Sequence, residues 1–106
     1  MSGKVFIVQN DGRFDLSAAR QYGEQVVIFG NKDLYPDNAN EQAPEALQRA
    51  YACLATFAPA TDFLCLVGSP LYVAICSYVL GDLGHAPVSL LRFDRIEGAY
   101  YPVKLR

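Results

Sequence analysis

The sequence lacks every short motif that would identify a catalytic or cofactor site. It contains no GxGxxG and no GxxxxGK[ST] segment, so neither dinucleotide binding nor P-loop chemistry is indicated. No serine has the GxSxG context of a hydrolase nucleophile. We therefore expect no catalytic residues and no cofactor. Whether the protein is an enzyme stays open, with a non-enzymatic role favoured.

Charged residues are scarce, at 19% of the chain, while apolar residues reach 52% and the net charge is −2. Typical domains have about 25% charged residues. Duplex nucleic acid is bound through clustered Lys and Arg, and the sequence has no basic stripe of that kind. We expect no duplex nucleic acid as a partner. The low charge suits a sheet covered on both faces, or a surface that meets a second subunit.

Cysteine and histidine do not occur in metal-binding or catalytic patterns. The three cysteines lie apart within apolar stretches and form no CxxC pair. They are expected to be buried thiols in a reducing compartment, which indicates a cytoplasmic protein. The only histidine, His85, follows a helix end and is expected to cap it. Acidic residues in turns usually form local hydrogen bonds, so we expect no metal.

Long hydrophobic runs give no clear membrane or export signal. The apolar run 5–8 is too short for a signal peptide. Residues 63–81 carry no charge, and this stretch is long enough to cross a bilayer. However, Gly68-Ser69-Pro70 divides this stretch into a strand-length and a helix-length part. We therefore expect no membrane span.

The chain instead shows an alternation of strand and helix patterns. Strands are predicted at 5–8, 25–29, 63–67, 88–93 and 100–105, and helices at 14–22, 44–57 and 70–83, with Pro44 in a first helical turn. A long polar loop is predicted at 30–40. This order predicts a single α/β domain over residues 1–106. It is a small three-layer Rossmann-like sandwich with a mostly parallel sheet and a C-terminal antiparallel hairpin.

Ligands of open parallel sheets bind beyond the carboxyl ends of the strands. That rule predicts a ligand site formed by Asn10, Asn31, Lys32, Gly68, Ser69, Asp94 and Arg95. Its sharpest feature is the start of the last predicted helix, where free N–H groups favour an anion and Ser69 adds a hydroxyl. The same Gly-Ser-Pro residues can also act as an ordinary helix cap, and Pro70 removes one N–H donor.

The last strand points to a partner. Tyr100 and Tyr101 lie on opposite faces of that strand, so one packs on the sheet and the other is exposed or covered. A small apolar domain with an edge hairpin is suited to pairing with a second copy, by strand addition or by face packing. We expect a homo-oligomer, most simply a dimer.

Several segments resemble a group of small bacteriophage proteins. These are 62–70 (DFLCLVGSP), 90–95 (LLRFDR) and 100–103 (YYPV), with an earlier stretch at 20–24 (RQYGE) followed by Val26-Val27. The corresponding segments of the phage group are D-[YF]-L-L-x-x-G-[DS]-P, L-L-[KR]-[WF]-D-R and Y-x-P-V, and the sequence resembles them. Ser69 stands where the group often has Asp. The resemblance implies a phage origin, hence the host cytoplasm, and it implies no assigned activity.

Two functions fit these observations. The first is a non-enzymatic phage accessory module that binds a host macromolecule or a small anionic ligand. The alternative is a protein that processes or sequesters nucleotides or phosphoesters at the strand ends, with Ser69, Lys32, Arg95 and Asp94 around the site.

Overall fold

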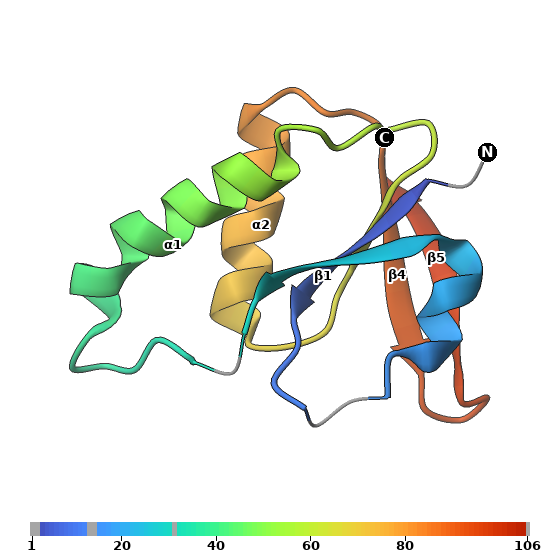
Figure 1. Cartoon of the computed structure of the whole chain (residues 1–106), viewed down its shortest axis with the longest axis horizontal. Coiled ribbons are helices and arrows are strands. Elements are labelled where there is room, and N and C mark those ends of the chain that lie inside the picture. The colour runs from blue at the N-terminus through green and yellow to red at the C-terminus, as the bar shows by residue number, and fades with distance from the viewer. Residues whose placement is uncertain (1–2, 13–14, 31, 106) are drawn as a thin grey trace.

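The computed structural model describes residues 3–12, 15–30 and 32–105. Its elements follow in the order β1 (Lys4–Gln9), η1 (Ser17–Tyr22), β2 (Glu24–Phe29), α1 (Ala39–Leu54), β3 (Phe63–Cys65), α2 (Pro70–Asp82), β4 (Val88–Asp94) and β5 (Ala99–Leu105). η1 is a short 3₁₀ helix. The alternation predicted from the sequence is therefore present along the chain (Figure 1).

The five strands form one sheet in the order β2-β1-β3-β4-β5. The first four strands are mutually parallel, and β5 pairs antiparallel with β4. The predicted α/β class, mostly parallel sheet and antiparallel last strand are thereby confirmed. From β1 the chain moves outward to β2 and then crosses back to β3 on the other side. The order of strands reverses between β1 and β3, which is where such sheets usually bind ligands.

The two faces of the sheet are covered unequally. Both α1 and α2 lie on one face (Figure 1), where they enclose the larger core with Phe6, Ile28 and Leu64. The other face has a smaller core in which Leu16 and Ala19 meet Val5 and other strand residues. Its only helix among the described residues is η1. The full helical layer that the three-layer prediction required on this face is therefore not found.

The predicted boundaries of α1 and β3 differ from the structure. α1 begins at Ala39, so Pro44 lies inside the helix and not in its first turn. The chain turns into α1 at Asn38, whose Oδ1 accepts from the Tyr35 N–H at 2.7 Å and whose carbonyl accepts from the Gln42 N–H at 2.9 Å. β3 ends at Cys65 because the Val67 N–H turns back to the Cys65 carbonyl. No helix in the described part of the chain is long and apolar enough to cross a membrane.

A buried carboxylate joins the start of β1 to the turn before β3. Asp62 is 5% exposed and accepts hydrogen bonds from the Lys4 N–H at 2.8 Å and the Ala58 N–H at 2.7 Å. The Thr61 hydroxyl donates to it at 3.2 Å. The carboxylate thereby joins two segments that are 58 residues apart in the chain.

We expect Asp62→Ala to lower the free energy of unfolding by about 2–4 kcal/mol, because it leaves two partly buried N–H donors without an acceptor. Urea unfolding at neutral pH measures the change. Thr61→Ala is the matched control, since it removes only the hydroxyl and should cost less than about 1 kcal/mol. Equal stability of the two variants would contradict this role for Asp62.

Candidate functional site

The carboxyl edge of the sheet is organised around one buried amide, that of Gln9. Gln9 ends β1 at the point where the strand order reverses, and it is 2% exposed. Its Nε2 donates to the Gly30 carbonyl at 2.9 Å and to the Lys32 carbonyl at 3.1 Å. Its Oε1 accepts from the Ser69 N–H at 2.7 Å. The side chain thus joins the loop after β2 to the start of α2 and occupies the space between these two segments.

Gly68 allows this close approach. Its φ is +120°, a conformation that side chains other than glycine rarely adopt. A Cβ atom on Gly68 would lie 2.3 Å from the Cβ of Gln9 and 2.7 Å from its Oε1. Gly68 was predicted to let an anion approach the backbone. In the structure, the Gln9 side chain lies against it instead.

A cleft of about 740 Å³ lies on the β4 side of this junction, and we call it the hairpin cleft. Its lining comes from the segment after β3 and from the β4–β5 hairpin, namely Leu66, Val67, Gly68, Arg92, Phe93, Asp94, Arg95, Ile96 and Tyr101. The Asp94 Oδ1 accepts from the Ile96 N–H at 2.9 Å, so this carboxylate shapes the hairpin turn. No hydrogen bond or ion pair joins the side chain of Arg92 or Arg95 to another described residue. Two guanidinium groups are therefore open to one cleft.

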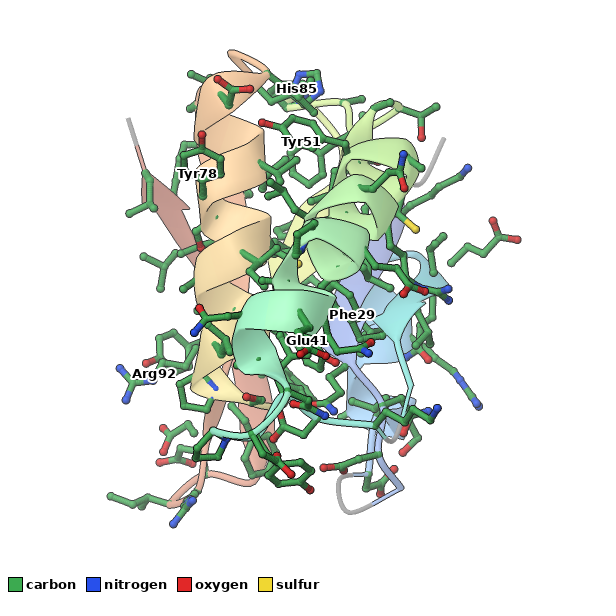
Figure 2. All side chains as sticks on the ribbon, turned by 90° about the vertical axis from the view of Figure 1, so that its left-hand side faces the viewer. Phe29, Glu41, Tyr51, Tyr78, His85 and Arg92 are labelled. Atoms are coloured by element: carbon green, nitrogen blue, oxygen red, sulfur yellow. The ribbon has the colours of Figure 1, made fainter. Side chains whose placement is uncertain are left out.

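A second cleft of about 800 Å³ lies on the β2 side, and we call it the α1 cleft. Its lining joins the end of β2 and the following loop to one face of α1. The buried rings of Phe29 and Tyr72 stack here with centroids 4.0 Å apart, and Figure 2 shows Phe29 behind α1. Burial raises the pKa of Tyr72, Asp33 raises it further and Arg49 opposes them. The Arg49 Nε donates to the Ile28 carbonyl.

The predicted site residues therefore fall in different places. Gly68, Asp94 and Arg95 line the hairpin cleft, whereas Lys32 lines the α1 cleft. Ser69 lies between them, with its N–H bound to Gln9.

The two predicted asparagines contribute less to this picture. Asn10 is exposed, and its Oδ1 accepts from the Gly12 N–H at 3.2 Å, which is a local turn contact. Asn31 lies outside the described residues. The structure therefore brings three of the predicted residues together in one cleft.

Sequence reasoning missed Gln9, Arg92 and the aromatic pair. Gln9 directly follows the apolar run of β1 and precedes Asn-Asp-Gly, so it is indistinguishable from a turn residue in the sequence. Arg92 precedes the predicted strand end by one residue, and only its register opposite Tyr101 places it beside the cleft. A rule that included both the last two residues of each predicted strand and the first residue after it would have found both.

The opposite edge of the sheet holds His85. Its backbone N–H donates to the Leu80 carbonyl at 3.1 Å, so the main chain and not the imidazole ends α2. The ring lies 6.0 Å from that of Phe57, centroid to centroid, and the Nε2 atom is buried without a hydrogen-bond partner among the described residues. Figure 2 shows His85 beyond the end of the helix pair, far along the molecule from Arg92.

Among the described residues, no group of three or more His, Cys, Asp or Glu side chains could hold a metal ion. Two of the aspartates at strand ends bind backbone N–H groups nearby, Asp33 that of Leu34 at 2.7 Å and Asp94 that of Ile96. These carboxylates therefore serve the turns in which they lie.

The cysteines are free thiols, with Cys65 and Cys76 fully buried and Cys53 half-buried. Burial raises the pKa of both Cys65 and Cys76 to about 12, although a hydrogen bond with Tyr100 acts the other way on Cys65. The thiolate is the reactive form. At pH 8 these two thiols are ionised in only about one molecule in ten thousand. Neither is suited to nucleophilic catalysis.

We expect one thiol, that of Cys53, to react quickly with Ellman's reagent at pH 8 in the folded protein. The other two should react only as fast as the chain opens, because burial both raises their pKa and blocks access. Absorbance of the released thionitrobenzoate measures the number of reacting thiols. In denaturant, all three thiols should react at once. Two or more fast thiols in the folded protein would contradict this assignment.

Comparison with known proteins gives a family but no activity. Residues 3–106 match the family described as "Phage Pam3 gp32-like protein", which covers nearly the whole chain. No curated protein and no solved structure gives a significant match. The resemblance to small phage proteins is thereby supported at the level of the family, and the chain belongs to the phage Pam3 gp32-like family.

Proposed function

We propose that this protein is a non-enzymatic binding module that holds a small anionic ligand in the hairpin cleft. The observation that carries this proposal is the pair of arginines, Arg92 and Arg95, which line one cleft and whose guanidinium groups form no ion pair with a described residue. Arginine binds carboxylate and phosphate groups through paired N–H donors. Asp94 lies between them, but its carboxylate accepts from the hairpin backbone.

The rest of the cleft suggests the kind of ligand. Ile96 is 93% exposed, and Phe93 and Tyr101 are each about 40% exposed. These side chains offer apolar and aromatic surface beside the two positive charges. A small molecule with a phosphate or carboxylate at one end and a flat apolar body fits this arrangement best.

The Ser69 helix start, in contrast, contributes little to anion binding. Its N–H donates to Gln9, and Pro70 has no N–H to offer. The positive charge of the proposed site therefore comes from the hairpin arginines. The Gly68 main chain forms the opposite wall.

We expect titration with inorganic phosphate, AMP or a cyclic dinucleotide to shift the backbone amide signals of residues 66–68 and 92–96 in ¹H–¹⁵N NMR spectra. Arg95→Ala and Arg92→Ala should each weaken binding of the same probe at least about tenfold, because each removes a charge-assisted contact. Arg20→Ala is the matched control. Arg20 is an exposed arginine of η1 outside this cleft, and its loss should leave the affinity unchanged.

Three outcomes would overturn the proposal. The first is the absence of shifts in these segments with every probe. The second is an equal loss of affinity in Arg20→Ala, which would indicate attraction by net charge alone. The third is chemical conversion of the added nucleotide, observed as new ³¹P NMR signals. This result would favour the alternative of a nucleotide- or phosphoester-processing protein.

A further inference from the structure

The last two strands leave part of the sheet uncovered on the side of the helices. Leu64 of β3 belongs to the core beneath α1 and α2, and it pairs with Leu90, which in turn pairs with Val103. Paired residues share a face, so Val103 faces the helix side, and alternation adds Tyr101 and Leu105. These three residues, which we call the β5 face, are 36–50% exposed. No element in the described part of the chain therefore covers this row of large apolar side chains.

Helix α2 carries a second exposed apolar surface on the same side of the sheet. No charged residue occurs between Pro70 and Gly81. Leu71, Ala74 and Tyr78 lie at i, i+3 and i+7 and are all exposed, so they form one row along the helix, which we call the α2 stripe. Figure 2 shows Tyr78 beside α2, on the outside of the helix pair. Tyr78 is 61% exposed.

The free edge of β5 is poorly suited to strand addition. Pro102 in the middle of the strand has no N–H to donate, and the Tyr22 hydroxyl donates to the Tyr100 carbonyl at 3.1 Å. Lys104 adds an exposed charge beside them. Proline and lysine are common means by which proteins protect an edge strand from pairing. Of the two routes to a dimer, face packing is the one that these contacts favour.

We propose that a second copy of this chain covers the β5 face, with the α2 stripe of each protomer packed on the β5 face of the other. A two-fold axis makes this arrangement self-complementary, because the uncovered strands need an apolar helix surface and the same chain exposes one. An anionic or basic partner would find no complementary charge along residues 70–81, because the first charged residue of α2 is Asp82 at its end. Arg92 pairs with Tyr101 at the end of this face and belongs to its polar rim, beside the hairpin cleft.

The available area supports a dimer of this kind. Five large or medium apolar side chains that are one third to two thirds exposed contribute on the order of 500 Å² per protomer. Their half-buried neighbours Val88 and Leu90 extend this surface. Stable interfaces bury about 800 Å² per partner and biological ones exceed about 1,000 Å² in total. The combined stripe and face of two protomers therefore reach about 1,000 Å², the lower limit for a biological interface.

Analytical ultracentrifugation tests the proposal. The wild-type protein should sediment at twice the chain mass of 11.7 kDa at micromolar concentrations. Tyr78→Glu and Val103→Glu should each raise the dissociation constant of the dimer at least about 100-fold, because each change occurs twice at a symmetric interface and costs about tenfold per site. Lys104→Glu is the matched control on the same strand. It changes the charge more but faces the other side of the sheet, so it should remain dimeric.

Circular dichroism and the melting temperature of the monomeric variants check that they are folded, which the exposure of Tyr78 favours. A wild-type protein that stays at 11.7 kDa across this range would overturn the proposal. Dissociation by Lys104→Glu together with persistence in Tyr78→Glu would place the interface on the β5 edge instead. Arg95→Ala should leave the dimer intact, so failure of the ligand site and failure of the dimer are separate results.

Discussion

Gly68→Ala is expected to lower the free energy of unfolding by at least about 3 kcal/mol. Two effects act together at this position. The φ of +120° is unfavourable for any residue with a Cβ atom. The added Cβ would also overlap the Cβ of Gln9 at 2.3 Å and its Oε1 at 2.7 Å. Since Gln9 is held by three hydrogen bonds, it cannot move aside without losing them.

Two other glycines separate these effects in urea unfolding experiments. Gly98 has a φ of +66° and open space around it, so Gly98→Ala should cost about 1–2 kcal/mol from the backbone alone. Gly30 has neither a positive φ nor a neighbour within 4 Å, and Gly30→Ala should change stability little. A loss in Gly68→Ala no larger than in Gly98→Ala would show that contact with Gln9 is unimportant.

The strands and α2 could be predicted because their signals are local. The clearest strand signal is a short apolar run that is buried in the structure, as with Val5 to Val8. The start of α2 at Pro70 agrees with the Gly-Ser-Pro sequence before it. The start of α1 was wrong by five residues because Ala39, Asn40 and Glu41 show no apolar period and resemble a loop. The helix gains them through the turn at Asn38, which periodicity does not reveal.

The candidate site was less predictable, because strand order decides which strand ends are neighbours. The carboxyl-end rule places Lys32 and Arg95 at one edge of the sheet, since Lys32 lies in the loop after β2 and Arg95 directly follows β4. In the observed order, however, β1 and β3 stand between β2 and β4. Two clefts result where one site was expected. No pattern in the sequence fixes this lateral order.

The partners of Gln9 explain why this residue escapes sequence analysis. They lie 21, 23 and 60 residues away in the chain. One amide supplies two donated hydrogen bonds to carbonyls and one accepted bond from an N–H, which only an asparagine or glutamine can do. The residue therefore acts as a positioning group. It fixes the wall of the hairpin cleft at Gly68 and the wall of the α1 cleft at Lys32 relative to one another.

Gln9→Glu is expected to destabilise the protein strongly and to make its stability depend on pH. The new carboxylate can still accept from the Ser69 N–H, but its second oxygen would face the Gly30 and Lys32 carbonyls in place of a donor. Burial and the two carbonyls disfavour the charged form, so the pKa of the glutamate in the folded variant is raised above its unfolded value of about 4.3. The protonated acid can donate to one carbonyl. The variant should therefore be most stable below about pH 4 and lose several kcal/mol as pH rises through the raised folded pKa.

Urea unfolding of the variant between pH 4 and pH 8, relative to the wild type at each pH, measures this dependence. Gln42→Glu on the exposed side of α1 is the matched control, and its stability relative to the wild type should be nearly the same at both ends of the range. Gln9→Leu removes the three hydrogen bonds without adding a charge, and should cost about 3–5 kcal/mol at every pH. If Gln9→Glu were as stable at pH 8 as at pH 4, the amide would not be the buried junction that joins the two clefts.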